Sequence, residues 1–170
     1  TNTTMLESNS PHMAKTLDFL AELGVPTVGL NALIYAGHGA TVGTGLRERE
    51  LPALLELARR KPDLNAQRLI WYTPTQYCNF DPMQLELGVK GCTAALYNMC
   101  IEPDGSVLPC QSYYHSLGNF LESDWEEIWN HDLCISLRER KYVQDKCHGC
   151  LLLPECGGGC PLATEFVTIA

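Results

Sequence analysis

The sequence lacks the features of a membrane-bound, secreted or nucleic-acid-binding protein. It has no run of about 18 apolar residues, the length that a membrane-spanning helix needs, and no basic stretch before an apolar segment that would act as a signal peptide. Basic residues are few, because 12 Lys and Arg stand against 20 Asp and Glu, for a net charge of −8. Such a charge disfavours binding to phosphate-rich partners. We therefore expect a cytoplasmic protein that binds neither nucleic acid nor membrane.

Cysteine, in contrast, is abundant. Nine cysteines occur among 170 residues. An odd number in a chain without a visible export signal argues against a disulfide framework, since cytosolic thiols stay reduced. Metal ligation is therefore the leading explanation for these cysteines.

The first 75 residues alternate between strand and helix patterns. Apolar periodicity predicts strand, helix, strand, helix and strand, in that order, over residues 1–6, 11–23, 27–35, 47–61 and 69–72. Ser10 is the expected N-cap of the first helix, and Gly24 is the expected left-handed residue after it. Alternating buried strands and helices predict parallel βαβ units, as in a doubly wound sheet or part of a (β/α)8 barrel. Because a complete barrel needs about 250 residues, we expect a barrel fragment.

The composition changes from residue 76, where cysteine, glycine and proline become frequent, and a second, small α+β domain is predicted over residues 76–170. Pro103 and Gly105 form a turn sequence that predicts a β-hairpin. Ser123 and Glu126 have the spacing of a capping box, which opens a short helix. Predicted elements of this domain are the hairpin and two helices, over residues 97–108, 123–129 and 133–142.

Four cysteines near the end of the chain have spacings typical of metal sites. Cys147 and Cys150 are separated by two residues, so that a tight turn points both thiolates at one metal, and three glycines separate Cys156 from Cys160. Residues without side chains let backbone N–H groups approach the sulfides of a cluster. A structural zinc site of four cysteines fits the same residues. These four residues alone do not separate the two alternatives.

The wider pattern favours iron and sulfur. Cys92, Gly105 and Cys110, followed by Cys147-x2-Cys150-x5-Cys156-x3-Cys160, resemble the cysteine signature of the SPASM domain, the auxiliary-cluster domain of many radical S-adenosylmethionine (SAM) enzymes. Further similarity lies in residues 101–110, 117–119, 125–129 and 156–161. The resemblance implies an α/β fold in which residues 1–75 are the end of a partial (β/α) radical SAM barrel. Residues 76–170 would then be a Cys-rich α+β SPASM-like domain.

The resemblance also implies two sets of cluster ligands. Cys92, Cys110 and Cys160 match ligands of a first auxiliary 4Fe–4S cluster, and Cys78 is the only upstream thiol for its fourth position, with a partly buried free cysteine as the alternative. A second cluster has three matching ligands, and the further cysteine expected after Cys160 is not found in residues 161–170. These three ligands are Cys147, Cys150 and Cys156.

Two cysteines fall outside this signature. Cys100 lies in the predicted hairpin and Cys134 near the start of a predicted helix. Both have apolar neighbours in the sequence, and cysteine is among the residue types most often buried. We expect both to act as small hydrophobic residues of the core.

The chain lacks the motif that starts radical chemistry in this family. Cleavage of SAM uses a 4Fe–4S cluster held by Cys-x3-Cys-x2-Cys, and no such triplet occurs in the sequence. The nearest spacing begins at Cys156 and Cys160 and has Ala163 in the third place. We therefore expect the C-terminal part of a longer enzyme, inactive alone, with its radical-generating cluster upstream of Thr1.

Cofactor and partners follow from the same resemblance. SAM lies at the carboxyl ends of the barrel strands in these enzymes, so Tyr35, Gly37, His38 and Gly39 are candidates for contact with SAM or substrate. Simple loop and surface roles compete with this assignment. The implied substrate of the radical modification is a peptide, or a tetrapyrrole or other cofactor precursor, and an electron-donor protein is a further implied partner. The alternative function is a zinc-stabilised structural or interaction module without catalytic activity.

Overall fold

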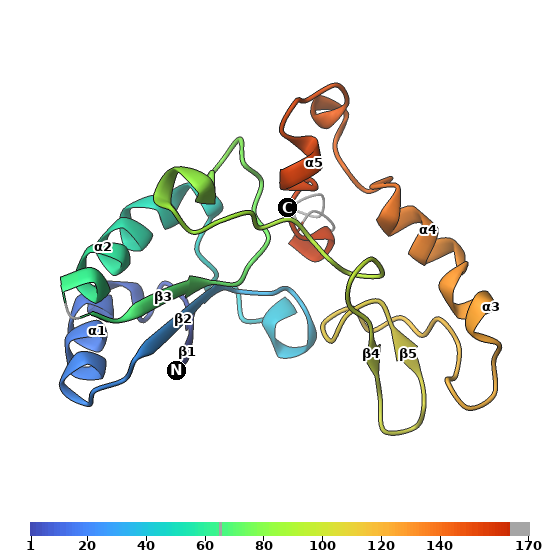
Figure 1. Cartoon of the computed structure of the whole chain (residues 1–170), viewed down its shortest axis with the longest axis horizontal. Helices are drawn as coiled ribbons and strands as arrows, with labels where there is room; N and C mark the ends of the chain where they lie inside the picture. The colour runs from blue at the N-terminus through green and yellow to red at the C-terminus, as the bar shows by residue number, and fades with distance from the viewer. Residues whose placement is uncertain (65, 164–170) are drawn as a thin grey trace.

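The chain folds into two lobes, each with its own hydrophobic core. The structure is a computed structural model, and it describes residues 1–64 and 66–163. Figure 1 shows a sheet with two helices in the lobe coloured blue to green, and a hairpin with short helices in the lobe coloured yellow to orange. No helix in the described part of the chain has the length and apolar character to cross a membrane.

A three-stranded parallel sheet forms the centre of the first lobe. Its order is β1 (Asn2–Met5), β2 (Thr27–Ala32) and β3 (Arg68–Trp71), so the predicted parallel βαβ units are confirmed. In the register of this sheet, Leu30 lies opposite Thr3 on one side and Trp71 on the other. β2 ends before residue 35 because the neighbouring strands offer no backbone partners beyond Ala32.

Two helices cover one face of this sheet. They are α1 (Met13–Glu22) and α2 (Leu51–Leu64), which follow the short 3₁₀ turns η1 (Ser10–His12) and η3 (Glu48–Glu50). Buried residues of these two helices pack on Val28, Leu30 and Trp71 of the sheet. The buried helix residues are Met13, Leu17, Leu51, Leu55 and Ala58. The first core thus forms between the helices and the sheet.

The ends of α1 match the sequence prediction in part. Gly24 has a φ of 69°, as expected for the residue that follows the helix. Ser10 is not the N-cap, because it lies inside η1, which begins after Asn9. The Asn9 side chain instead accepts a hydrogen bond from Leu6 N at 2.9 Å, so it fixes the turn between β1 and η1.

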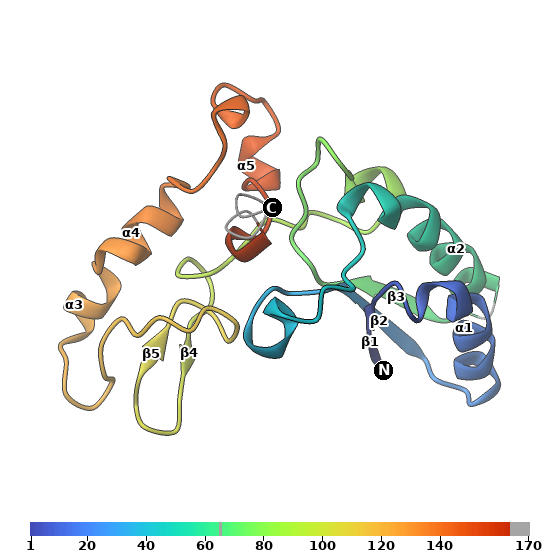
Figure 2. The same cartoon turned by 180° about the vertical axis from the view of Figure 1, so that it is seen from behind.

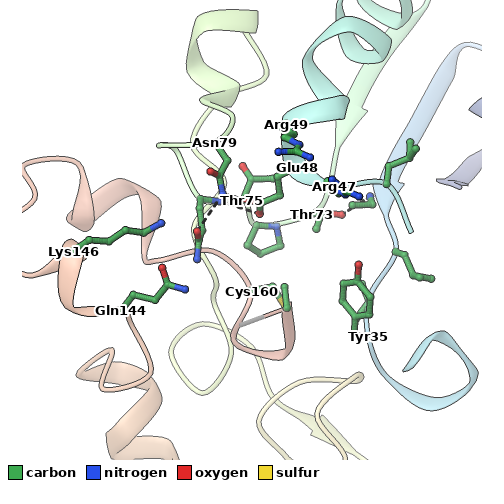
Figure 3. Close-up of a pocket in the computed structure, with 17 residues that line it drawn as sticks. Tyr35, Arg47, Glu48, Arg49, Thr73, Thr75, Asn79, Gln144, Lys146 and Cys160 are labelled. Atoms are coloured by element: carbon green, nitrogen blue, oxygen red, sulfur yellow. Dashed lines mark hydrogen bonds between the residues drawn. The ribbon is translucent and has the colours of Figure 1, made fainter. Parts of the chain in front are cut away.

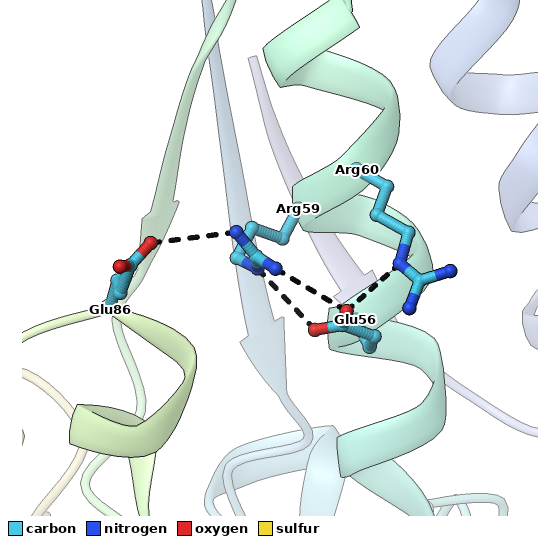
Figure 4. A network of polar contacts seen from close by, with 4 residues as sticks. All are labelled: Glu56, Arg59, Arg60 and Glu86. Atoms are coloured by element: carbon cyan, nitrogen blue, oxygen red, sulfur yellow. Dashed lines mark hydrogen bonds and ion pairs between the residues drawn. The ribbon is translucent and has the colours of Figure 1, made fainter.

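The first core continues past residue 75. Phe80 is buried in it, and Leu85 at the end of η4 (Pro82–Leu85) packs against it. Arg59 of α2 contacts Glu56 at 3.4 Å and Glu86 at 3.5 Å, which joins the helix to the turn after η4 (Figure 4). Such exposed ion pairs stabilise a fold by about 1 kcal/mol or less, so the apolar contacts hold this segment in place.

The second lobe contains a hairpin and short helices. β4 (Cys100–Ile101) and β5 (Val107–Leu108) pair antiparallel, as predicted. Gly105 in the turn has a φ of 88°, and a Cβ there would lie 2.6 Å from Asn119 Oδ1. The Asn119 amide donates to Asp104 O at 2.9 Å. Both the positive φ and the close Asn119 side chain therefore require glycine at this position.

Three helices and one 3₁₀ turn complete this lobe, namely α3 (Trp125–Trp129), α4 (Asp132–Arg138), η5 (Asp145–Cys147) and α5 (Leu153–Cys156). The predicted capping box is wrong, because Asp124 is the N-cap of α3 and Ser123 Oγ accepts from Asn119 N at 3.2 Å instead. α4 ends earlier than residue 142, since Arg140 has a φ of 57°, which a helix does not allow.

The carboxyl ends of β2 and β3 point toward the second lobe (Figures 1 and 2). Ala32 at the end of β2 donates its N–H to Thr73 Oγ1 at 2.9 Å, and this bond is buried. It ties the chain after β3 to the end of β2. The hydroxyl of Thr73 thereby fixes the edge of the sheet on which the site described below is built.

We expect Thr73→Val to destabilise the first lobe by about 1–3 kcal/mol, because Ala32 N–H would stay buried without an acceptor. Urea unfolding measures this change. Thr73→Ser is the matched control, since it keeps the hydroxyl and removes only a methyl group. Equal loss of stability in both variants would contradict a role for the hydrogen bond.

Candidate metal centre and adjoining pocket

Cys92, Cys110 and Cys160 come together from three separate segments, and we call them the first thiol group. Cys92 lies on the segment that enters the second lobe, Cys110 follows β5, and Cys160 follows α5. Burial first, and then the nearby thiols of Cys92 and Cys110, raise the pKa of Cys160 to about 11. Burial, and to a lesser extent Cys110, also raises the pKa of Cys92. The three side chains thus share one poorly solvated region.

Backbone contacts bring these three segments together. Ala95 N donates to Pro109 O at 3.0 Å, which joins the chain after Cys92 to the chain before Cys110. Gly91 lies against α5, where a Cβ would come within 2.7 Å of Glu155 O. The positions of the thiols are therefore set by main-chain packing rather than by flexible side chains.

A cavity of about 140 Å³ is lined by four cysteines, and we call it the thiol cavity. Cys147, Cys150 and Cys156, which we call the second thiol group, line it together with Cys78. Cys150 N donates to Cys147 O at 3.1 Å in the turn between these two residues. Cys156 is buried, and its Sγ accepts a hydrogen bond from Tyr77 N at 3.3 Å. The remaining residues of the lining are Gln76, Tyr77, Lys146, Leu152, Leu153 and Gly158.

The two thiol groups are joined by a backbone that strongly favours glycine. Gly157, Gly158 and Gly159 have φ values of 64°, 81° and 83°, all in the left-handed region. A Cβ at Gly158 would collide with the Val143 side chain, and one at Gly159 would lie 3.2 Å from Gln76 N. The glycine run therefore reverses the chain within a few residues and places Cys156 and Cys160 in different thiol groups.

Two side chains of the chain before η5 support this reversal. Arg140 donates from its guanidinium to Leu153 O and to Pro154 O, the latter at 2.8 Å. Tyr142 OH donates to Gly157 O at 2.6 Å. These bonds give additional donors to carbonyl groups of α5 and of Gly157, and Leu153 O also accepts from Gly157 N at 2.9 Å.

The donor set of the two groups consists of thiols, the ligands that soft metals and iron–sulfur clusters prefer. In the described residues, no three metal-binding side chains stand close enough to hold a single ion. Zinc requires sulfurs about 2.3 Å from one centre, whereas the cysteines of a cluster bind different irons and stand further apart. The arrangement of the thiols around a cavity and beside bare glycine backbone is compatible with the ligands of an iron–sulfur cluster.

Cys100 and Cys134 differ from each other in burial. Cys134 is fully buried, and its thiol donates to Ile128 O at 3.5 Å, so the prediction of a small core residue is confirmed for it. Cys100 is only partly buried, and its thiol lies 3.8 Å from Glu102 Oε1. The core prediction is therefore wrong for Cys100, which lies on a two-residue strand too short to bury both of its faces.

A larger pocket of about 400 Å³ lies at the carboxyl ends of β2 and β3, and we call it the sheet-end pocket. Part of its lining is apolar, with Ala32, Leu33 and Ile34, and Cys160 of the first thiol group also lines it. Figure 3 shows the polar side chains around it, which come from both lobes. They are Tyr35, Arg47, Glu48, Arg49, Thr73, Thr75, Gln76, Asn79, Gln144 and Lys146.

Glu48 is the most constrained charge of this pocket. Its carboxylate accepts hydrogen bonds from Gln76 N at 3.1 Å and from Asn79 Nδ2 at 2.9 Å. Burial raises the pKa of Glu48, although these two bonds and the positive charge of Lys146 oppose the rise. The carboxylate therefore orders the chain after β3 and sets an acidic point among the basic side chains of the pocket wall.

The four residues predicted to contact SAM or substrate lie in two different places. Tyr35 lines the sheet-end pocket. Gly37, His38 and Gly39 form the 3₁₀ turn η2 (Gly37–Ala40) and are not part of its described lining. A Cβ at Gly39 would collide with Ile34 O, so this glycine allows the turn to fold back on the chain after β2. Of these four residues, Tyr35 alone is part of the described lining of the pocket, and a contact with SAM or substrate stays a prediction for all four.

The fold and its grouped thiols define a metal-binding domain of the cysteine-rich kind. Residues 92–151 match the family model SPASM, described as an iron–sulfur cluster-binding domain. This segment of the chain is therefore similar to the SPASM family, whose domains bind iron–sulfur clusters. Cys92, Cys110, Cys147 and Cys150 lie within the match, while Cys78, Cys156 and Cys160 lie outside it.

Solved structures of radical SAM/SPASM enzymes share the fold. SuiB of Streptococcus suis has a TM-score of 0.64 and 18% identity, and the match covers 95% of this chain and 41% of SuiB. The enzyme anSMEcpe with bound AdoMet (SAM) has a TM-score of 0.60 and 18% identity, with 94% of this chain and 46% of that chain covered. A second structure of anSMEcpe, with AdoMet and a Cp18Cys peptide, gives a TM-score of 0.57 at 18% identity, with the same coverages of 94% and 46%.

These likenesses show the fold alone, because the identities are low. The chain spans less than half the length of the solved structures that it matches. No curated protein sequence matches the chain. The chain is thus a mixed α/β structure like part of a radical SAM/SPASM enzyme, and its three-stranded sheet as the end of a partial barrel stays a proposal.

Sequence reasoning did not find several residues of the sheet-end pocket. Arg47, Glu48 and Arg49 precede a helix and Lys146 precedes a metal-ligand motif, so no spacing marks them as a group. Glu48 and Lys146 are nearly 100 residues apart, by their numbers. A partial signal for Arg47, Glu48 and Arg49 is their position after a predicted parallel strand, because loops at such positions carry binding residues.

Replacing Gly158 tests the backbone at the thiol groups. Gly158→Ala has to adopt a left-handed φ and displace Val143, so we expect it to lose stability and to bind less iron than the unaltered protein. Gly149→Ala is the matched control, because both glycines have a φ of 81° but a Cβ at Gly149 meets nothing within 4 Å. We expect the control to cost about 1–2 kcal/mol in urea unfolding and Gly158→Ala clearly more. Equal losses would show that close packing around the glycine run is unimportant.

Proposed function

We propose that this chain is the auxiliary-cluster part of a radical SAM enzyme. Its two thiol groups bind one or two auxiliary 4Fe–4S clusters, and its sheet-end pocket receives the substrate. The match of residues 92–151 to the SPASM family and the fold shared with radical SAM/SPASM enzymes support this function. The 170 residues contain no Cys-x3-Cys-x2-Cys motif, so the proposal concerns auxiliary clusters and not the cluster that cleaves SAM.

The observation that carries the proposal is the position of Cys160. This residue belongs to the first thiol group and also lies in the wall of the sheet-end pocket. A cluster bound there would supply electron transfer or a site for substrate binding. The functional assignment thus depends on one cysteine that connects the metal ligands to a pocket of about 400 Å³.

The side chains of the pocket would bind and orient the substrate. Arg47, Arg49 and Lys146 are cationic side chains, and guanidinium and ammonium groups bind carboxylates. Ala32, Leu33 and Ile34 supply an apolar surface that excludes water. The pocket therefore suits a substrate with both apolar and acidic parts.

A peptide, or a tetrapyrrole or other cofactor precursor, has this character, and we propose these as the substrate classes. A structure of anSMEcpe contains a Cp18Cys peptide, which supports the peptide class by likeness. We also propose an electron-donor protein as a partner, since redox work at an iron–sulfur cluster needs a source of electrons.

Metal analysis tests the proposal. We expect anaerobically purified protein to be brown and to contain iron and acid-labile sulfide, because the ligands are thiolates arranged for clusters. The Cys92→Ala and Cys110→Ala variants should lose about half of the iron if two clusters are present, and nearly all of it if only the first is present. Cys134→Ala is the matched control, since it removes a buried thiol outside both groups and should keep its iron.

The alternative function, a zinc-stabilised module, predicts the opposite result. It requires a colourless protein with zinc in a fixed ratio to the chain and no acid-labile sulfide. Such a result after anaerobic purification would overturn the proposed function.

A further inference from the structure

The second thiol group has three cysteines, one fewer than a fully ligated cluster needs. The family pattern expects a further cysteine after Cys160, and residues 161–170 contain none. One further cysteine of the described residues lies beside this group and is a candidate for the fourth ligand.

Cys78 is in the right place. It lines the same cavity as Cys147, Cys150 and Cys156, although it is about 70 residues earlier in the sequence. The charges that act on Cys160 of the first thiol group come, in contrast, from Cys92 and Cys110. The structure thus places four thiols around the thiol cavity and three thiols in the first thiol group.

A rigid turn holds Cys78 at this cavity. Asn79 N and Phe80 N both donate to Gln76 O, at 2.8 and 3.0 Å, which closes the turn around Cys78. Tyr77 is buried, and its hydroxyl accepts from Lys90 N at 2.9 Å. The turn is therefore fixed on both sides of the cysteine.

The same turn is joined directly to the second thiol group. Tyr77 N donates to Cys156 Sγ, and the Cys156 thiol lies 3.6 Å from Thr75 O. Cys78 itself is exposed, which is unusual for a residue type that is normally buried. An exposed thiol on a rigid turn that lines a cavity together with three other cysteines is suited to ligation rather than to packing.

We propose that Cys78, Cys147, Cys150 and Cys156 form one four-cysteine cluster site, with Cys78 as the fourth ligand. The proposal rests on the proposed function, because it takes the metal to be an iron–sulfur cluster. It replaces the assignment of Cys78 to the first cluster that the sequence resemblance implied. The first cluster would then have three cysteine ligands, Cys92, Cys110 and Cys160.

The test measures one cluster at a time. A Cys92→Ala/Cys110→Ala protein should keep about four iron atoms per chain in the second site. Adding Cys78→Ala should lower this iron at least twofold, as adding Cys147→Ala does, whereas adding Cys100→Ala should leave it unchanged. In a Cys147→Ala/Cys150→Ala protein, Cys78→Ala should have no effect on the remaining iron.

Single serine variants give a second measurement that does not depend on the double variants being folded. In the dithionite-reduced protein, Cys78→Ser should shift the same electron paramagnetic resonance signal as Cys147→Ser and leave the signal shifted by Cys92→Ser unchanged. A shift of the Cys92 signal by Cys78→Ser, or no shift of either signal, would overturn the proposal. Absence of iron from the unaltered protein would instead overturn the proposed function.

Discussion

The hydrogen bond from Tyr77 N to the buried Cys156 thiol joins the two lobes at the thiol cavity. It fastens the chain after β3 to the end of α5, so the sheet, the glycine run and both thiol groups keep fixed positions relative to one another. A sulfur is a weak acceptor, and the bond alone adds little free energy. Its importance is geometric, because the same buried thiol also donates to Thr75 O at 3.6 Å and so contacts two backbone groups of the chain after β3.

The division of the thiols follows from this packing. Cys156 and Cys160 are close in sequence, yet the reversal at Gly157–Gly159 turns one toward the thiol cavity and the other toward the sheet-end pocket. A cluster at the first group would thus lie beside the substrate, and one at the second would lie further from it. Different tasks for the two groups are a natural result of this geometry.

The sequence predicted the order of strands and helices in the first lobe because long apolar periods dominate there, as in α2 and β2. It also predicted the hairpin at Gly105, where the turn requires a positive φ. Local signals failed where tertiary contacts decided the outcome. Ser123 has the spacing of a capping box but bonds to Asn119, and Cys78 faces a cavity made by residues about 70 positions away. No pattern of spacing contains such long-range contacts.

Gln76 and Lys146 each line both the sheet-end pocket and the thiol cavity. They form a shared wall, so a molecule that fills one cavity alters the water and the electric field in the other. The reduction potential of an iron–sulfur cluster depends on hydrogen bonds and on solvent exposure. Occupation of the pocket would therefore tune the potential of a metal centre that the bound molecule does not touch.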